Sequence, residues 1–273
     1  MNQTYDALIV GAGAAGLTAA AYCAKSGLST LVLERAAKVG GLVGSFPHKG
    51  FTFDAGIRAF EDSGVILPML RSLDIPLQFV KNPVTIALSD RKVRLSGEES
   101  LPEYADLFKS FFPQESGAID AIMQEVVKVM RYMDVLYGIE NPLFLDGELK
   151  DPQYLTKTLL PWLMKYSVNI KKASRLREPV QQYLKRFTQN SALIDMICQH
   201  FFAETPTFFA LSYFGLYLDY RYPVGGTGKL PQVLSDYILS HGGDIQTSSE
   251  VVRVIPEAHI AYLADGSEIR YRQ

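Results

Sequence analysis

Apolar positions near the start of the chain form continuous runs rather than an alternating pattern. Residues 7–10 and 31–33 are entirely aliphatic, as is typical of strands covered on both faces of a parallel sheet. They predict strands over residues 6–10 and 30–33. The alanine-rich stretch 17–25 between them predicts a helix, and Gly27 stands where a helix C-cap belongs. This order of elements predicts a β-α-β unit of an α/β fold.

The pattern changes after residue 63 and becomes mainly helical. A short strand is expected over 77–80, and a hairpin over 84–88 and 92–95. Helices are expected over 64–73, 102–112, 117–137, 153–166, 179–188, 191–202 and 207–218. A second β-rich stretch follows, with a helix over 228–240, strands over 244–247 and 251–255, and a hairpin over 260–263 and 268–271.

The first strand runs directly into a glycine-rich turn, Gly11-Ala12-Gly13-Ala14-Ala15-Gly16. Gly11 permits the tight turn from strand to helix, Gly13 lets a pyrophosphate approach the backbone, and Gly16 lets the helix pack closely on the strands. The helix N-terminus then offers unpaired N–H groups to the phosphates. These residues predict a dinucleotide-binding site.

An acidic residue, Glu34, ends the second strand, 23 positions after Gly11. An acid at about this offset accepts hydrogen bonds from the ribose of a bound dinucleotide. A carboxylate there repels a 2′-phosphate, so NADP is disfavoured. The glycines alone are weak evidence for a nucleotide site. The interpretation is much better supported because a strand, the glycines, a helix, a second strand and the acidic residue occur in the expected order and spacing.

Composition excludes several other classes. The formal net charge of −2 indicates no nucleic-acid partner. The two cysteines, Cys23 and Cys198, and four scattered histidines provide no disulfide framework and no metal site. The N-terminus lacks the basic region of a signal peptide, and no long uncharged apolar run could span a membrane. A cytoplasmic protein is therefore expected, with peripheral membrane contact left open.

Three further landmarks carry a family resemblance. Gly40-Gly41 follows the second strand and leads to Ser45, Phe53-Asp54-Ala55-Gly56 comes next, and 223–231 reads PVGGTGKLP. In this order they resemble the phytoene desaturase and flavin amine oxidase superfamily. The resemblance implies an FAD cofactor, a Rossmann-like FAD-binding domain over 1–62 and 221–273, and an inserted, mainly helical α+β substrate domain over 63–220.

The same resemblance assigns cofactor contacts beyond the glycine turn. It implies contacts from Arg35, Gly40, Gly41 and Leu42, and a backbone contact from Val251 to the adenine. Amine oxidases carry an arginine where this chain has Leu42. That departure favours the desaturase, isomerase and retinol saturase branch. It also means that Arg35 or Lys38 would have to supply the positive charge beside the phosphates.

Aromatic residues crowd the end of the middle region. They are Phe201, Phe202, Phe208, Phe209, Tyr213, Phe214, Tyr217, Tyr220 and Tyr222. They can line a channel for a lipophilic substrate or form ordinary core. The Trp-bearing segment 159–166, with basic residues after it, can likewise be a membrane-interface helix or a packed helix with a solvated basic loop.

The resemblance implies an oxidoreductase that transfers hydride between flavin N5 and a carotenoid- or retinoid-like polyene. A flavin amine oxidase is the alternative enzyme. Members of the superfamily continue beyond Gln273 with further flavin contacts, so the C-terminal part of the fold is expected to be absent. A non-catalytic nucleotide-binding fragment is therefore an alternative of a different class. The sequence identifies no catalytic residue and no oligomeric state.

Overall fold

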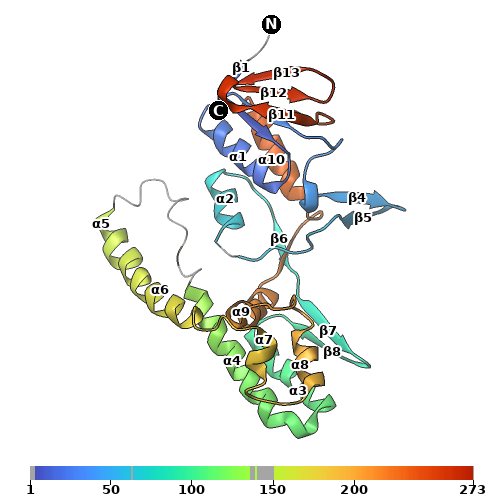
Figure 1. Cartoon of the computed structure of the whole chain (residues 1–273), viewed down its shortest axis with the longest axis vertical. Coiled ribbons are helices and arrows are strands. Elements are labelled where there is room, and N and C mark those ends of the chain that lie inside the picture. Colours follow the sequence, from blue (N-terminus) through green and yellow to red (C-terminus); the bar gives the residue numbers. More distant parts are fainter. Residues whose placement is uncertain (1–3, 63, 136–138, 140–150, 273) are drawn as a thin grey trace. The chain divides into compact units, whose positions relative to one another are not determined.

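The computed structural model describes residues 4–62, 64–135, 139 and 151–272. The chain divides into two compact units (Figure 1). The first comprises Met1–Ala59, Met69–Val80 and Tyr222–Gln273, and the second comprises Phe60–Pro68 and Lys81–Arg221. This division differs from the expected domains in three places: residues 60–62 and Arg221 group with the second unit, and residues 69–80 group with the first. The reason for the last difference is that Met69, Leu70 and Leu73 are buried there, and Met69 Sδ accepts a hydrogen bond from Thr18.

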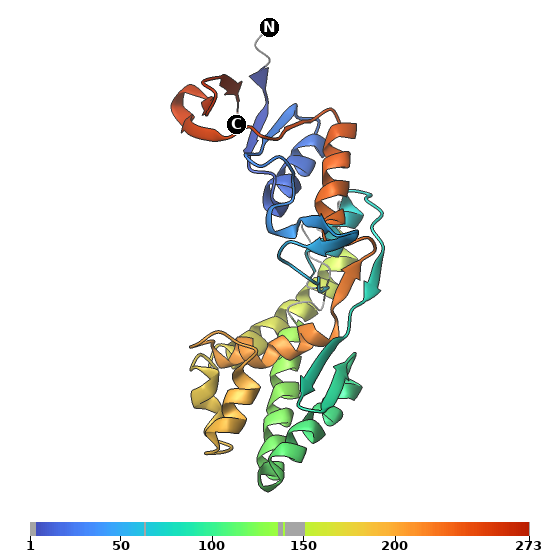
Figure 2. The ribbon, with the colours of Figure 1, turned by 90° about the vertical axis from the view of Figure 1, so that its right-hand side faces the viewer.

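The first unit contains two sheets and a helical layer. Its parallel sheet has the order β10 (Asp244–Gln246), β3 (Thr30–Leu33), β2 (Ala7–Val10). The second sheet has the order β1 (Thr4–Tyr5), β13 (Glu268–Tyr271), β12 (Ile260–Leu263), β11 (Val251–Ile255). Helices α1 (Ala14–Lys25) and α10 (Lys229–Ser240) lie side by side (Figures 1 and 2). A hairpin of β4 (Ser45–His48) and β5 (Phe51–Asp54) completes the unit.

Strand β3 explains why residues 31–33 are apolar at every position. All four of its residues are buried. Leu31 and Leu33 pack in a cluster with Tyr5 and Leu263, which belong to the second sheet. Neighbouring side chains point to opposite faces of a strand, so Val32 is covered on the other side. The parallel order β10-β3-β2 is one half of a doubly wound dinucleotide fold.

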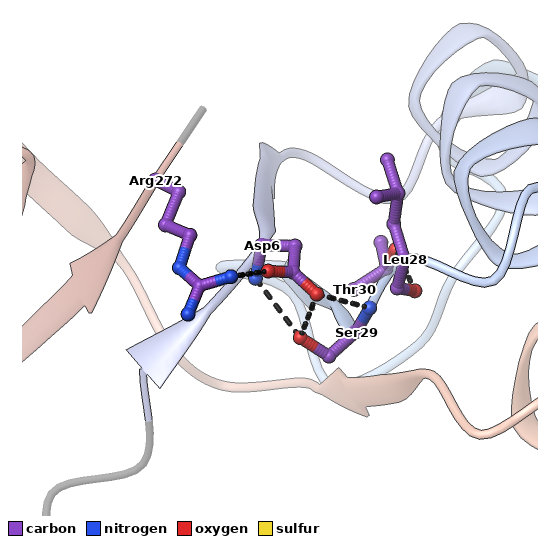
Figure 3. Close-up of polar contacts among 5 residues, drawn as sticks. All are labelled: Asp6, Leu28, Ser29, Thr30 and Arg272. Carbon is purple, nitrogen blue, oxygen red and sulfur yellow. Dashed lines mark hydrogen bonds and ion pairs between the residues drawn. The ribbon is translucent and has the colours of Figure 1, made fainter.

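A polar cluster fixes the entry to β2 (Figure 3). The Asp6 carboxylate accepts hydrogen bonds from Ser29 N–H at 3.0 Å and Ser29 Oγ at 2.7 Å, and from Arg272 Nη1 at 2.6 Å. The Ser29 hydrogen bonds, followed by the Arg272 charge, hold the pKa of Asp6 below its ordinary value despite some desolvation. Asp6 therefore ties together the starts of β2 and β3 and the segment after β13.

The second unit is mainly helical. Its elements are β7 (Val84–Leu88), β8 (Arg91–Leu95), α3 (Leu101–Phe111), α4 (Ser116–Asp134), α5 (Pro152–Tyr154), a π-helix (Leu155–Leu159), α6 (Leu160–Ala173), α7 (Val180–Leu184), α8 (Ser191–Cys198) and α9 (Thr207–Leu218). The expected hairpin and most expected helices are confirmed. Tyr104, Phe108 and Phe214 lie fully buried at its centre. Three further elements contain a boundary between the two units: α2 (Ile66–Ser72), β6 (Phe79–Lys81) and β9 (Arg221–Pro223).

Three expected helix boundaries in this unit are wrong. The helix expected over 191–202 ends at Cys198. The helix expected over 153–166 continues to Ala173, so the predicted basic loop begins later. The helix expected over 179–188 ends at Leu184, because Arg186 and Phe187 form tighter turn hydrogen bonds. The end of the helix expected over 117–137 lies outside the described residues. No described helix is both long and apolar enough to cross a bilayer.

Gly16→Ala is expected to destabilise the first unit. A Cβ at Gly16 would lie 2.0 Å from the Gly11 carbonyl oxygen, so the backbone must shift. Overpacking of this kind costs about 1–3 kcal/mol. Urea unfolding measures the change.

Gly117→Ala in α4 is the matched control, since a Cβ there meets no atom within 4 Å. Alanine in a helix is favoured over glycine, so this variant should be unchanged or more stable by up to ~1 kcal/mol. Equal effects of the two substitutions would contradict the packing argument.

Candidate dinucleotide-binding site

The turn between β2 and α1 is held against the end of β3. Gly11 has a φ of 97°, and its N–H donates to the Leu33 carbonyl at 2.7 Å. Residues with a side chain rarely adopt this backbone conformation, so glycine allows the turn. The close approach of Gly16 to Gly11 then seats the first turn of α1 directly on the strand.

The space in front of Gly13 is open. Gly13 precedes α1 in an extended conformation, and a Cβ added to it would meet no heavy atom within 4 Å. The next side chains, Ala14 and Ala15, are small, and the first turn of α1 contains no acidic residue. N–H groups at a helix start lack intrahelical acceptors and carry partial positive charge. This end of α1 therefore has the shape and charge that phosphate groups require.

Glu34 directs its carboxylate back onto this turn. Oε2 accepts a hydrogen bond from Ala12 N–H at 2.7 Å, and Oε1 accepts one from Ala36 N–H at 2.8 Å. The Glu34 N–H donates to Gln246 O at 2.9 Å, which anchors its backbone to β10. The acid therefore lies beside the glycine turn, as its spacing in the sequence predicts.

The double glycine meets the glycine turn. Gly40 N–H donates to Ala12 O at 2.8 Å, and Gly40 and Gly13 form a β-bridge. Gly40 and Gly41 have positive φ values of 113° and 55°. A Cβ on Gly41 would lie 3.5 Å from Gly13 Cα. Glycine at both positions thus brings two separate loops into backbone contact.

The Asp-x-Gly landmark packs on the same segment through its backbone. Ile57 N–H donates to Leu42 O at 3.1 Å, and a Cβ on Gly56 would lie 2.7 Å from that oxygen. The Leu42 side chain itself is 79% exposed. Position 42 therefore contributes its carbonyl to the fold and presents an apolar side chain outward.

Asp54 links the second and third landmarks. Its carboxylate accepts hydrogen bonds from Tyr222 Oη at 2.7 Å, Thr227 N–H at 3.0 Å, Thr227 Oγ1 at 2.8 Å and Ser45 Oγ at 3.3 Å. Ser45 Oγ also accepts from Gly228 N–H at 2.9 Å. Partial burial acts to raise the pKa of Asp54, but these hydrogen bonds outweigh it and hold the pKa below the ordinary value.

A cavity of about 560 Å³ lies beside the joined loops. Its lining includes Val39, Gly44, Ser45 and the start of α10, together with two lysines, Lys38 and Lys229. Of the two cations suggested by the sequence, Lys38 lines this cavity, whereas Arg35 is exposed and is not part of the lining. Lys229 Nζ donates to Gln232 Oε1 at 2.9 Å. Lys229 was not a candidate from the sequence, because the segment 223–231 was interpreted through its glycines.

Val251 begins β11 and packs against the cluster of Leu31, Leu33 and Leu263. Just before it, Ser249 N–H donates to Glu34 O at 2.8 Å. The strand start that the resemblance associates with the adenine therefore lies next to the Glu34 backbone. A register shift between Val251 and Arg253 interrupts the pairing of β11 with β12 at this point.

The second unit has its own cavity, of about 310 Å³. Met130, Met133, Phe209, Tyr213 and Leu216 supply its apolar lining. The aromatic residues that crowd together in the sequence separate in the structure: Phe202 is 91% exposed, and Tyr222 donates its hydroxyl to Asp54. Phe209 and Tyr213 line this cavity, whereas Phe214 is fully buried core.

Four carboxylates, from Glu61, Asp62, Asp134 and Asp219, also line this second cavity. Desolvation raises the pKa of Glu61, and the nearby Asp219 charge adds to the effect. Desolvation likewise raises the pKa of Asp134. This group could not be predicted from the sequence, because its members come from three distant segments.

The Asp54 hydrogen bonds generate a stability prediction. Tyr222→Phe removes one donor to a charged acceptor and should lower the free energy of unfolding by about 1.5–3 kcal/mol. Tyr262→Phe is the matched control, since no hydrogen bond of its hydroxyl to another described residue is present. Equal urea midpoints for the two variants would contradict the proposed linkage.

A pH series tests the charge of Asp54. The pKa of Asp54 is lowered in the folded protein. Its contribution to the free energy of unfolding is therefore complete above the unfolded-state pKa of about 3.9, and it is lost as the pH falls through the folded-state pKa. Asp54→Asn should therefore be less stable than wild type near neutral pH. The difference should shrink towards pH ~3, and a constant difference would contradict the assignment.

Comparison with known proteins agrees with this geometry. A family described as an NAD(P)-binding Rossmann-like domain matches residues 9–73. Prolycopene isomerase of Daucus carota is 26% identical over 98% of this chain and 45% of its own length. All-trans-retinol 13,14-reductase of Homo sapiens is 28% identical over 93% of this chain and 42% of its own length. The chain thus spans less than half the length of these curated relatives.

Solved structures share the fold at low sequence identity. An oxidoreductase from Methanosarcina mazei has a TM-score of 0.62 at 16% identity, covering 98% of this chain and 57% of that one. A putrescine oxidase has a TM-score of 0.56 at 15% identity, covering 99% and 57%. The chain is therefore similar to prolycopene isomerases and all-trans-retinol 13,14-reductases, and its residues 9–73 match an NAD(P)-binding Rossmann-like domain.

Proposed function

We propose that the first unit binds FAD and that the chain belongs to an oxidoreductase acting on a lipophilic polyene. The observation that carries the cofactor proposal is the meeting of the glycine turn, the double glycine and Glu34 around the open space at Gly13. The N–H groups at the start of α1 would hold the pyrophosphate, and Glu34 would accept hydrogen bonds from the adenosine ribose.

The surrounding residues fit this cofactor. Gly40 and Gly41 let the second loop approach the pyrophosphate without side chains. Lys38 and Lys229 would supply positive charge from the adjoining cavity, in place of an arginine at Leu42. Val251 would present its backbone to the adenine, and Arg35 would lie near the adenosine end. The Glu34 carboxylate disfavours a 2′-phosphate, which makes NADP the poorer ligand.

Bound flavin would supply the hydride chemistry, and the protein would orient the substrate and exclude water. A lipophilic substrate is supported by the relatives, which are named for prolycopene and retinol. A cavity of the second unit offers one apolar side to such a substrate, formed by Met130, Met133, Phe209 and Tyr213, beside the four carboxylates that also line it. Its volume of about 310 Å³ lies at the low end of ligand-pocket sizes of roughly 300–1,000 Å³.

Two alternatives remain distinguishable. A flavin amine oxidase shares the fold, as the putrescine oxidase structure shows, but Leu42 occupies the position of the arginine in that family. The other alternative is a nucleotide-binding fragment without catalysis. Retention of flavin together with turnover of a polyene supports the enzyme, whereas retention without turnover supports the fragment.

Gly13→Val is the sharpest test of the cofactor site. The open space at Gly13 lets the fold accept the side chain, whereas a pyrophosphate in that space would be excluded. The purified wild-type chain should retain FAD after removal of excess, with a shifted flavin absorbance band. The variant should retain none. Circular dichroism checks that it is folded, and a folded Gly13→Val protein with unchanged FAD affinity would refute the assignment.

Glu34→Gln should weaken FAD binding without abolishing it. Loss of a charged acceptor for the ribose costs about 1.5–3 kcal/mol, or about 10- to 150-fold in Kd. Fluorescence titration measures the affinity. Glu257→Gln is the control, since Glu257 lies in the turn Pro256–Ala258 after β11. It should bind FAD as wild type does.

A further inference from the structure

Helix α6 and the turns before it expose an apolar face. The chain is helical from Pro152 to Ala173, through α5, a π-helix and α6. Leu160, Met164 and Val168 are each more than half exposed. Their spacing of four residues places them on one side of the helix. Leu163 is also exposed, beside this stripe.

The orientation of this face is fixed by the opposite side of α6. Trp162 Nε1 donates to Val135 O at 2.6 Å, at the end of α4, and the Trp162 ring packs on Tyr166. Ala173 is buried, and α6 packs on α4. The tryptophan that suggested a membrane segment in the sequence therefore points inward. It holds α6 so that Leu160, Met164 and Val168 point away from α4.

The charged residues of the segment that carries the apolar face have a single sign. Residues 152–177 contain six cations and no acidic residue. The cations are Lys157, Lys165, Lys171, Lys172, Arg175 and Arg177. None of them forms an ion pair with another described residue, and all six are exposed. Lys172 also lies over the Tyr132 ring, 5.3 Å from its centre.

We propose that this cationic apolar face, Leu160, Leu163, Met164 and Val168 with the six cations of 152–177, docks the protein on the surface of an anionic lipid bilayer. A helix with an apolar stripe flanked by lysines lies in the plane of a membrane interface, its apolar residues reaching below the headgroups. Each cation near an anionic leaflet adds a favourable interaction.

The same composition argues against a protein partner on this face. The cores of protein interfaces are depleted in lysine, whereas Lys171 lies in line with the apolar stripe by helical spacing and Lys165 lies beside it. Long lysine side chains can extend to the headgroups while their stems lie over apolar surface. Anionic lipid complements both the charge and the apolar stripe.

Sedimentation with lipid vesicles tests the proposal on the full chain and needs no flavin, so its outcome is independent of the proposed cofactor site. The protein should bind vesicles of phosphatidylcholine mixed with phosphatidylserine and bind phosphatidylcholine alone much more weakly. Binding should fall with added salt, because exposed charges are screened.

Two double variants separate charge from apolar insertion. Lys165→Gln with Lys171→Gln should weaken binding about 25-fold, at about fivefold per cation. Met164→Gln with Val168→Gln should weaken it on the order of tenfold through loss of apolar burial. Glutamine is a good helix former, so α6 should persist in circular dichroism spectra.

Matched controls are Lys92→Gln on β8 and Leu239→Gln on α10, which remove an exposed cation and an exposed apolar residue elsewhere. Both should bind vesicles as wild type does. Equal binding to the two kinds of vesicle, or unchanged binding of the α6 variants, overturns the proposal. A dimer of the wild-type chain in light scattering also overturns the proposal, if Met164→Gln with Val168→Gln dissociates that dimer and leaves vesicle binding unchanged. The apolar face would then join two copies of the chain.

Discussion

The carboxylate of Asp54 is the interaction on which the arrangement of the first unit depends. It joins β5 to Tyr222 and Thr227, which follow it in sequence by 168 and 173 residues. Most of the chain in between forms the second unit. A charged acceptor with several donors is strong enough to fix such a distant return of the chain. Through Ser45 it also positions the loop that carries the double glycine.

Much of the fold could be predicted because local pattern and tertiary environment agree. The buried strand β3 is apolar at nearly every position because both of its faces are covered, and the glycines at 11, 13 and 16 occur where the turn needs them. The hairpin of β4 and β5 was not predicted. Its phenylalanines at 46, 51 and 53 are exposed, so the strands lack the alternation that a half-buried hairpin shows.

The parts of the site that sequence could not predict come from distant segments. Nothing near Asp54 in the chain indicates that Tyr222 and Thr227 donate to it. The direction of the Trp162 side chain could not be predicted either, because the tryptophan of an apolar helix can lie on a packed face or on an exposed one. The π-helix before Pro161 shifts the helical phase by one residue. Helical periodicity counted across the π-helix therefore places the residues after it on the wrong face of the helix.

The two hydrogen bonds that Glu34 accepts have a consequence for discrimination between ligands. Ordering a free glutamate side chain costs up to about 2 kcal/mol of rotamer entropy. Here Ala12 and Ala36 have already ordered it, so the loss is incurred when the protein folds and not when a nucleotide binds. A preorganised carboxylate also cannot swing aside to accept a phosphate. In the proposed dinucleotide site, selectivity against phosphorylated ribose would thus be a property of the folded backbone, present before any ligand arrives.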